Sequence, residues 1–326
     1  MVKADAYGVG VAEVAPKLAK AGCRLFFVAD LGEGAALRRL VPRARIAILN
    51  GYLGDAGAFR RARLEPVLND LGQIAAWTRA GGGPAMIHLD TGMSRLGLPP
   101  AETARLARSP EILSRFPLTA IVSHLACGDV PSSPLNRRQL DAFRAMLKSL
   151  PRAPASLAAS SAIFLGPAYH FDFVRPGAAL YGVNPVPDRR NPMAQAVRLR
   201  AKILQTVAVP KDRNVGYDAT HRMRRDGTLA IVGVGYADGW FRAGSNKASV
   251  GIAGKRAPIV GRVSMDVLTV DVTGLPAAKV RPGAYVDLLD KDYGVDAFAE
   301  DAGTIGYEVL TSLAGRHHRV YRGSVR

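Results

Sequence analysis

Cysteine is scarce in this chain of 326 residues. Cys23 and Cys127 are its two cysteines, and no others follow. They build neither a disulfide framework nor the spacing of a metal-binding motif. The sequence therefore predicts a protein of the reducing cytoplasm without a metal site.

Long apolar runs and targeting segments are missing as well. No run approaches the roughly 18 apolar residues that a membrane-spanning helix needs. Met1 is not followed by the charged and apolar regions of a signal peptide. We therefore expect no membrane partner.

Acidic residues are few relative to basic ones. There are 27 Asp and Glu against 44 Lys and Arg, which gives a formal net charge of +17. Such a balance can indicate a nucleic-acid partner. Here, however, the basic residues are mostly Arg and lie in short groups along the whole chain, without a basic tail or an aromatic-interleaved stripe. We expect a solvated, arginine-rich surface and no nucleic-acid partner.

The sequence is rich in apolar residues and glycine. An apolar content of 48% and 34 glycines are typical of a globular α/β protein. Up to residue 181, strand-like runs alternate with helical patterns, which indicates a parallel sheet, open or closed into a barrel. The eight strand candidates are residues 2–3, 25–29, 45–49, 65–68, 85–89, 118–124, 155–159 and 172–181.

The pattern changes after residue 182. Residues 184–192 are rich in Pro, Arg and Asn and indicate a linker. Strand and turn patterns then dominate, and the next long helix is expected at about residues 306–313. The predicted domains are a barrel domain at residues 1–190 and a β-rich domain at residues 191–326. The strands expected in the second are residues 202–209, 229–235, 248–253, 257–260, 267–272 and 285–289.

Several polar residues lie at the ends of the predicted barrel strands, where the chemistry of a closed (β/α)₈ barrel gathers. Each also has an ordinary explanation, such as a solvated lysine, a structural ion pair, a core histidine or a helix cap. Lysine has a further ability, since it can condense with an aldehyde and hold a cofactor. The residues are Lys3, Arg95, His124, Ser161 and Arg175.

Short motifs surround these residues and continue into the second domain. They are V-K-A-D-A-Y-G at 2–8, D-T-G-M-S-R-L-G at 90–97, S-H-L-A at 123–126, R-P-G-A-A-L-Y-G at 175–182, G-Y-A-D-G at 235–239, G-R-V-S-M-D at 261–266 and G-Y-E-V at 306–309. In this order and spacing they resemble the alanine racemase family, whose members use pyridoxal phosphate in fold type III. The resemblance implies a (β/α)₈ barrel followed by a β-rich domain.

The resemblance also implies a cofactor site. Lys3 is expected to hold pyridoxal 5′-phosphate as a Schiff base, with His124 against the pyridine ring and Arg175 facing the ring nitrogen. Arg cannot accept a proton, so this choice favours return of a proton to Cα over transamination. The residues expected at the phosphate and along its cradle are Tyr7, Ser161, Gly177 and Tyr307.

The implied reaction is the interconversion of L- and D-alanine by two bases on opposite faces of Cα. Lys3 is the base on the D side and Tyr236 the base on the L side. Arg95 and the backbone N–H of Met265 are expected to hold the substrate carboxylate, with Arg95 also at the cofactor's phenolic oxygen. The resemblance further implies a homodimer with shared sites. A broader amino-acid racemase and an inactive cofactor-binding fragment stay open as alternatives, and a nucleic-acid module is a remote one.

Three features depart from the family pattern. Val9 replaces a usual His, and His88 replaces a lysine, often carbamylated, that orients the arginine of the D-T-G-M motif. The family also has a strand and a barrel-closing helix before the cofactor lysine. We therefore expect a barrel that lacks this helix, with apolar surface at its seam, in a chain whose start is assigned too late or trimmed.

Overall fold

The computed structural model describes residues 1–313 and 315–323. The chain forms two compact units. The first contains Met1–Leu180 and Pro185–Pro192, and the second contains Tyr181–Asn184 and Met193–Tyr321. The predicted boundary near residue 190 stays a prediction.

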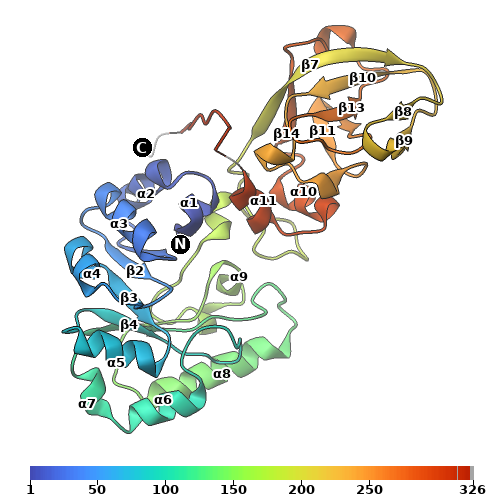
Figure 1. Ribbon diagram of the computed structural model, residues 1–326. Coiled ribbons are helices and arrows are strands. Elements are labelled where there is room, and N and C mark those ends of the chain that lie inside the picture. The colour runs from blue at the N-terminus through green and yellow to red at the C-terminus, as the bar shows by residue number, and fades with distance from the viewer. Residues whose placement is uncertain (314, 324–326) are drawn as a thin grey trace. The chain divides into compact units, whose positions relative to one another are not determined.

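The first unit is built around a parallel sheet with the strand order β1-β2-β3-β4-β5-β6, and helices lie on its outer side (Figure 1). Its strands are β1 (Leu25–Val28), β2 (Arg45–Ile48), β3 (Glu65–Leu68), β4 (Ala85–His88), β5 (Leu118–Val122) and β6 (Ala155–Ser156). Its helices are α1 (Lys3–Tyr7), α2 (Val11–Lys20), α3 (Leu31–Leu40), α4 (Ala56–Ala62), α5 (Leu71–Arg79), α6 (Pro100–Ala107), α7 (Pro110–Leu113), α8 (Pro134–Lys148) and α9 (Ser160–Ile163).

Two further segments complete this sheet as a barrel. On one edge, the Val2 N–H donates to the Phe27 carbonyl at 3.0 Å. On the other edge, Arg175 forms a parallel bridge with Ala159. The two segments meet where the Met1 nitrogen donates to the Pro176 carbonyl at 2.9 Å. Eight segments therefore surround the barrel interior.

The barrel interior is filled by apolar side chains from successive strands. Phe27 stacks on Phe173 with ring centroids 6.4 Å apart, so the first and last parts of the barrel share one core. Such parallel strands are buried on both faces, which explains their continuous apolar runs in the sequence. The buried core residues are Phe27, Ala47, Val67, Met86, Ala120 and Val122.

Aspartate caps begin several of the barrel helices. Asp30, Asp55 and Asp70 accept hydrogen bonds from the third residue of α3, α4 and α5 at 2.9, 2.9 and 2.7 Å. A carboxylate there satisfies a backbone N–H that lacks a partner inside the helix. The polar loops after the strands are thus set by local sequence.

The eighth predicted strand is only partly correct. Residues 172–175 run along β6, with the Arg175 N–H donating to the Ala158 carbonyl at 2.9 Å. Beyond them, Ala178–Tyr181 forms a 3₁₀ helix instead of the predicted strand. Pro176 lacks an N–H for a sheet ladder, and the Gly177 and Ala179 N–H groups bind the Ser160 hydroxyl.

The second unit is a six-stranded antiparallel sheet with the order β12-β11-β14-β7-β10-β13 and a separate β8–β9 hairpin. A bridge between Ile259 and Val270 joins its two end strands, so this sheet also closes. The strands are β7 (Leu199–Val209), β8 (Asn214–Val215), β9 (His221–Arg222), β10 (Gly227–Val232), β11 (Ser249–Ile252), β12 (Lys255–Pro258), β13 (Leu268–Asp271) and β14 (Tyr285–Leu289). The helices are α10 (Val295–Ala302) and α11 (Gly306–Ser312).

The six strands expected here all form. Helix α10 was not expected, because its eight residues are too short for a clear helical period. It contributes Phe298, whose ring stacks on buried Trp240 at a centroid distance of 3.7 Å. Tertiary packing therefore stabilises a helix that local sequence marks weakly.

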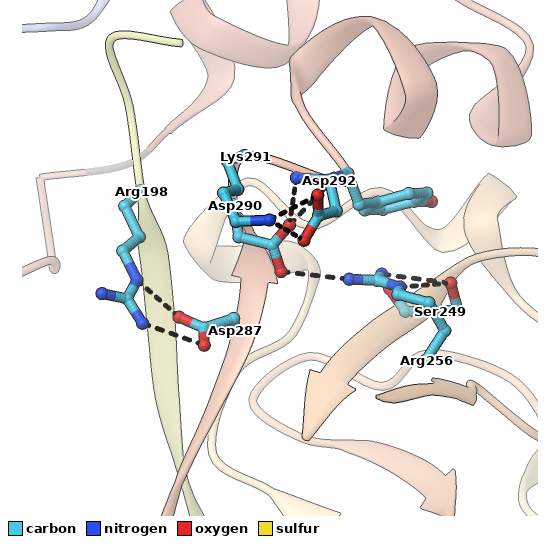
Figure 2. A network of polar contacts seen from close by, with 8 residues as sticks. Arg198, Ser249, Arg256, Asp287, Asp290, Lys291 and Asp292 are labelled. Carbon is cyan, nitrogen blue, oxygen red and sulfur yellow. Dashed lines mark hydrogen bonds and ion pairs between the residues drawn. The ribbon is translucent and has the colours of Figure 1, made fainter. Parts of the chain in front are cut away.

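A polar network fixes the turn after β14 (Figure 2). Asp290 accepts from Arg256 Nη1 at 3.2 Å and from the Asp292 and Tyr293 N–H groups at 2.8 Å. Arg198 binds Asp287 through two nitrogens, at 2.7 and 3.0 Å. Each carboxylate in this network already has protein partners, so we assign the network a structural role.

Candidate active site

Lys3 is followed by a left-handed turn. Ala4, Asp5, Ala6 and Tyr7 have φ values of 52°, 52°, 54° and 56°. This conformation costs L-residues roughly 1–2 kcal/mol each, so surrounding contacts must hold it. The Ala6 N–H donates to the Val2 carbonyl at 3.0 Å and the Gly8 N–H to the Ala4 carbonyl at 2.8 Å. These two hydrogen bonds stabilise the turn directly after Lys3.

The Lys3 amine is half-buried. Burial lowers its pKa below the usual value, Arg95 lowers the pKa further, and Glu33 opposes both effects. A lowered pKa increases the neutral fraction of the amine, which is the nucleophilic form. Lys3 is therefore suited to covalent chemistry with a carbonyl group.

Arg175 is buried, with 6% of its surface exposed. Its Nη1 donates to the Ser156 carbonyl and hydroxyl at 2.8 and 2.6 Å, and its Nη2 to the Ser123 and Leu157 carbonyls at 2.5 and 3.3 Å. Burial lowers its pKa to about 10, so the group still carries a charge at neutral pH. The guanidinium is held by neutral oxygen atoms at the strand ends, which leaves its positive charge available to the site.

Tyr7 and Gly177 come together next to α9. A Cβ added to Gly177 would lie 2.5 Å from Tyr7 Oη and 3.0 Å from Met1 Cβ. The Ser160 hydroxyl accepts from the Gly177 N–H at 2.9 Å and from the Ala179 N–H at 3.3 Å. The backbone at Gly177 and Ala179 therefore forms a tight cradle around the Ser160 hydroxyl, in which a larger residue at 177 would clash. Ser161, which follows Ser160, is half-buried. Sequence patterns place the phosphate here, and that assignment stays a prediction.

Asn69 fixes the protonation of His88. The buried Asn69 amide donates to the Leu49 and Val67 carbonyls, each at 2.9 Å. Its Oδ1 must therefore accept, at 2.9 Å, from His88 Nδ1. Burial, together with Arg175 and Arg95, lowers the His88 pKa to about 4. His88 is consequently a neutral imidazole with its proton on Nδ1.

His124 lies at the end of β5 in a similarly cationic place. Burial lowers its pKa to about 3, with further contributions from Arg175, Arg95, His88 and Lys3. These shared electrostatic effects place the five residues in one region at the carboxyl ends of the barrel strands. The structure thus brings together the predicted barrel-side residues Lys3, Arg95, His124 and Arg175.

A buried glutamine joins two loops of this region. Gln139 on α8 donates to Thr91 Oγ1 at 3.2 Å and to the His124 carbonyl at 3.0 Å, and accepts from the Ala126 N–H at 2.8 Å. The Thr91 hydroxyl in turn bonds that of Ser123 at 2.8 Å. Gln139 was not predicted, because a glutamine within a helix carries no motif signal.

The loop that carries Arg95 is shaped by Asp90. Asp90 Oδ1 accepts from the Gly92, Met93 and Ser94 N–H groups at 2.9, 2.8 and 3.2 Å. The Arg95 side chain itself is exposed at the surface of this unit. The loop is therefore fixed while the arginine can still turn toward a ligand.

In the second unit, Tyr236 and Met265 are neighbours. The Tyr236 N–H donates to the Ser264 carbonyl and the Ala237 N–H to the Met265 carbonyl, each at 3.0 Å. A Cβ at Gly235 would lie 2.3 Å from both carbonyls, so glycine permits this approach. Tyr236 and Met265 are 44% and 54% exposed. Both side chains are thus presented on the surface of this unit.

Three other predictions concern this unit or the described chain as a whole. Tyr307 is half-buried in α11, and its phosphate contact stays a prediction. No group of three His, Cys, Asp or Glu that could hold a metal ion occurs within residues 1–313 and 315–323. In the same residues, no helix is both long and apolar enough to cross a bilayer.

Comparisons with known proteins agree across the chain. A family model described as the alanine racemase N-terminal domain matches residues 1–185, and one described as the C-terminal domain matches residues 196–321. The chain is 46% identical to the alanine racemase of Acidiphilium cryptum over 99% of its own length and 91% of that protein. It is also 46% identical to a catabolic alanine racemase of Mesorhizobium japonicum, over 99% and 86%.

Solved structures give the same result. Alanine racemase from Bartonella henselae, solved with covalently bound pyridoxal phosphate, superposes with a TM-score of 0.93 and 40% identity, over 98% of this chain and 91% of that one. The biosynthetic enzyme of Pseudomonas aeruginosa gives 0.91 and 36%, over 99% and 91%. The predicted fold class, a barrel-like α/β domain with a β-rich second domain, is confirmed. The chain belongs to the alanine racemase family.

Proposed function

We propose that this protein is an alanine racemase, which interconverts L- and D-alanine with pyridoxal 5′-phosphate. The observation that supports it most is the meeting of the Lys3–Tyr7 turn with Gly177 and buried Arg175 at one end of the barrel. This end of the barrel thus carries the Lys3 amine, the backbone cradle at Gly177 and the fixed positive charge of Arg175.

The residues present suit the cofactor. The absence of a side chain at Gly177 lets the Tyr7 hydroxyl lie close to the backbone, and this hydroxyl can donate a hydrogen bond to a phosphate. When bound, pyridoxal phosphate supplies an aldehyde that captures amines and a ring that makes the Cα hydrogen of the amino acid acidic. Lys3 Nζ would hold it, and Arg175 would donate to the ring nitrogen. Because Arg175 accepts no proton, that nitrogen stays unprotonated.

Lys3 and Tyr236 exchange the proton at Cα. Racemisation needs one group to remove the proton from one face while another group returns a proton to the opposite face. Lys3 acts on the D side and Tyr236 on the L side, while Arg95 and the Met265 N–H hold the substrate carboxylate. The exposure of Tyr236 and Met265 supports a homodimer in which each chain completes its partner's site.

A direct assay tests the proposed function. The purified chain is loaded with pyridoxal phosphate, and D-alanine formation from L-alanine is followed by chiral chromatography. We expect visible absorbance from lysine-bound cofactor and continuous D-alanine formation. Absence of both would show that the chain is an inactive fragment. Equal rates with bulkier amino acids would indicate a broader racemase.

Lys3→Ala tests the covalent assignment. After borohydride reduction, the wild-type peptide that contains residue 3 should carry the cofactor mass, and the variant should carry none. Lys20, which is exposed at the end of α2, provides the matched control, since Lys20→Ala should keep the label on Lys3. Labelling of another lysine in Lys3→Ala would overturn this assignment.

A further inference from the structure

Glu33 departs from the usual pairing at the start of a helix. Asp30 caps α3, and its Oδ1 accepts from the Glu33 N–H at 2.9 Å. In a capping box, the glutamate at this position reaches back to the N–H of the capping residue. Here the Glu33 carboxylate instead binds the Ala29 N–H at 2.7 Å through Oε2 and the Ala4 N–H at 2.6 Å through Oε1.

The two N–H groups that the Glu33 carboxylate binds lie beside Lys3 and at the end of β1. The Ala4 N–H belongs to the peptide bond that follows Lys3, and Ala29 directly follows the last residue of β1. Val2, the residue before Lys3, is also fixed to this strand, since its N–H donates to the Phe27 carbonyl at 3.0 Å. Lys3 is therefore held on one side by the sheet and on the other by Glu33.

The turn after Lys3 needs such support. Its four left-handed residues are unfavourable by roughly 1–2 kcal/mol each, and strained segments persist only where neighbouring contacts define them. Glu33 provides a charge-assisted hydrogen bond to the first of these residues. Such bonds are roughly twice as strong as neutral ones.

We propose that Glu33 is a positioning residue for Lys3, whose carboxylate clamps the Lys3–Ala4 peptide to the end of β1 and so aims the amine into the site. This role rests on the proposed function of Lys3. Both carboxylate oxygens are required as acceptors, because the two partners are both N–H donors. A glutamine offers one acceptor and turns its NH₂ group against the other N–H.

The test compares Glu33→Gln with Glu65→Gln. Glu65 is also a barrel glutamate, and its carboxylate accepts two hydrogen bonds from Arg45 and one from Thr119, at 2.7 Å each. It lies at the first residue of β3, the opposite end of the strand from the site. In the loaded enzyme we expect Glu33→Gln to lower kcat by about 10- to 100-fold with KM within about twofold. Glu65→Gln should lower the melting temperature and leave kcat per folded site within about twofold.

Amide hydrogen exchange gives a second readout on the cofactor-free protein. We expect faster exchange in the peptide covering residues 2–10 of Glu33→Gln, with unchanged exchange in β3 and β4. If Glu33→Gln fails to fold, Glu33→Ala replaces it, with added formate as a substitute carboxylate that should restore part of kcat and of the protection.

Three outcomes would overturn the proposal: unchanged kcat in Glu33→Gln, unchanged exchange in residues 2–10, or equal loss of kcat in Glu33→Gln and Glu65→Gln. A wild-type chain without racemase activity contradicts the proposed function instead. The exchange measurement still decides in that case whether Glu33 holds the Lys3 turn.

Discussion

At Gly177 the backbone passes directly beneath the hydroxyl of Tyr7. Gly177→Ala would place a methyl group 2.5 Å from Tyr7 Oη, so the tyrosine must move. We expect pyridoxal phosphate to bind about tenfold or more weakly, which corresponds to about 1.4 kcal/mol or more. Titration of cofactor-free protein by visible absorbance measures this. Gly315→Ala, where a Cβ meets no atom within 4 Å, is the control. Equal affinity of wild type and Gly177→Ala would contradict the assignment of the cradle.

The two neutral histidines predict a pH dependence of stability. The pKa of His88 is lowered to about 4 and that of His124 to about 3, from an ordinary 6.5. Below pH 6.5 the unfolded chain therefore binds protons that the folded one does not. The free energy of unfolding should fall as pH decreases toward 4, by up to about 1.4 kcal/mol per pH unit for each histidine.

Urea unfolding between pH 7 and 4.5 measures this slope. His88→Gln should reduce this slope by about the contribution of one histidine, because Gln does not titrate. His318 is exposed, so His318→Gln should leave the slope unchanged. A slope that is equal in wild type and His88→Gln would show that His88 is protonated in the folded state. The bond from His88 to Asn69 would then need another explanation.

At the scale of elements, α8 supports the site through Gln139. Gln139→Leu leaves the Ala126 N–H without its acceptor and removes two donors from Thr91 and His124. Loss of a buried hydrogen-bonding partner costs about 1–3 kcal/mol, and we expect a loss of unfolding free energy in that range by urea denaturation. Arg138→Leu, at the exposed neighbouring position, is the control. A change below about 0.5 kcal/mol for Gln139→Leu would contradict this role.

Most elements were predictable from the sequence because their signals are local. Apolar runs marked the six strands of the barrel sheet and the six main strands of the second unit. The strand expected over residues 172–181 ends early, because Pro176 and the Ser160 hydroxyl act through contacts that periodicity does not contain. Helix α10 depends on packing against Trp240, which is equally invisible in a local pattern.

The site was predictable where motifs carry it. Lys3, Arg95, His124 and Arg175 lie at one end of the barrel, and their roles toward cofactor and substrate stay predictions. Glu33, Asn69 and Gln139 were not found, because each acts by contacting backbone or side chains distant in the sequence. The left-handed turn was not anticipated either, since Ala4–Tyr7 contains no glycine. The phosphate contacts of Ser161 and Tyr307 stay predictions.

At the scale of the molecule, the proposal requires two chains. Lys3 belongs to the first unit and Tyr236 to the second, and exposed Tyr236 and Met265 suit residues that reach a partner. We expect light scattering to give twice the mass of 34.6 kDa. A monomer with full racemase activity would contradict the shared site.

The central claim is that Lys3 of one chain and Tyr236 of another act on the same substrate. Co-expressing differently tagged Lys3→Ala and Tyr236→Phe chains and purifying the mixed dimer by both tags tests it. Each variant alone should lack racemisation. In the mixed dimer, one site has lost both groups and the other has kept both, so D-alanine formation should return to about half of the wild-type rate. A mixed dimer as inactive as its parents would contradict the claim.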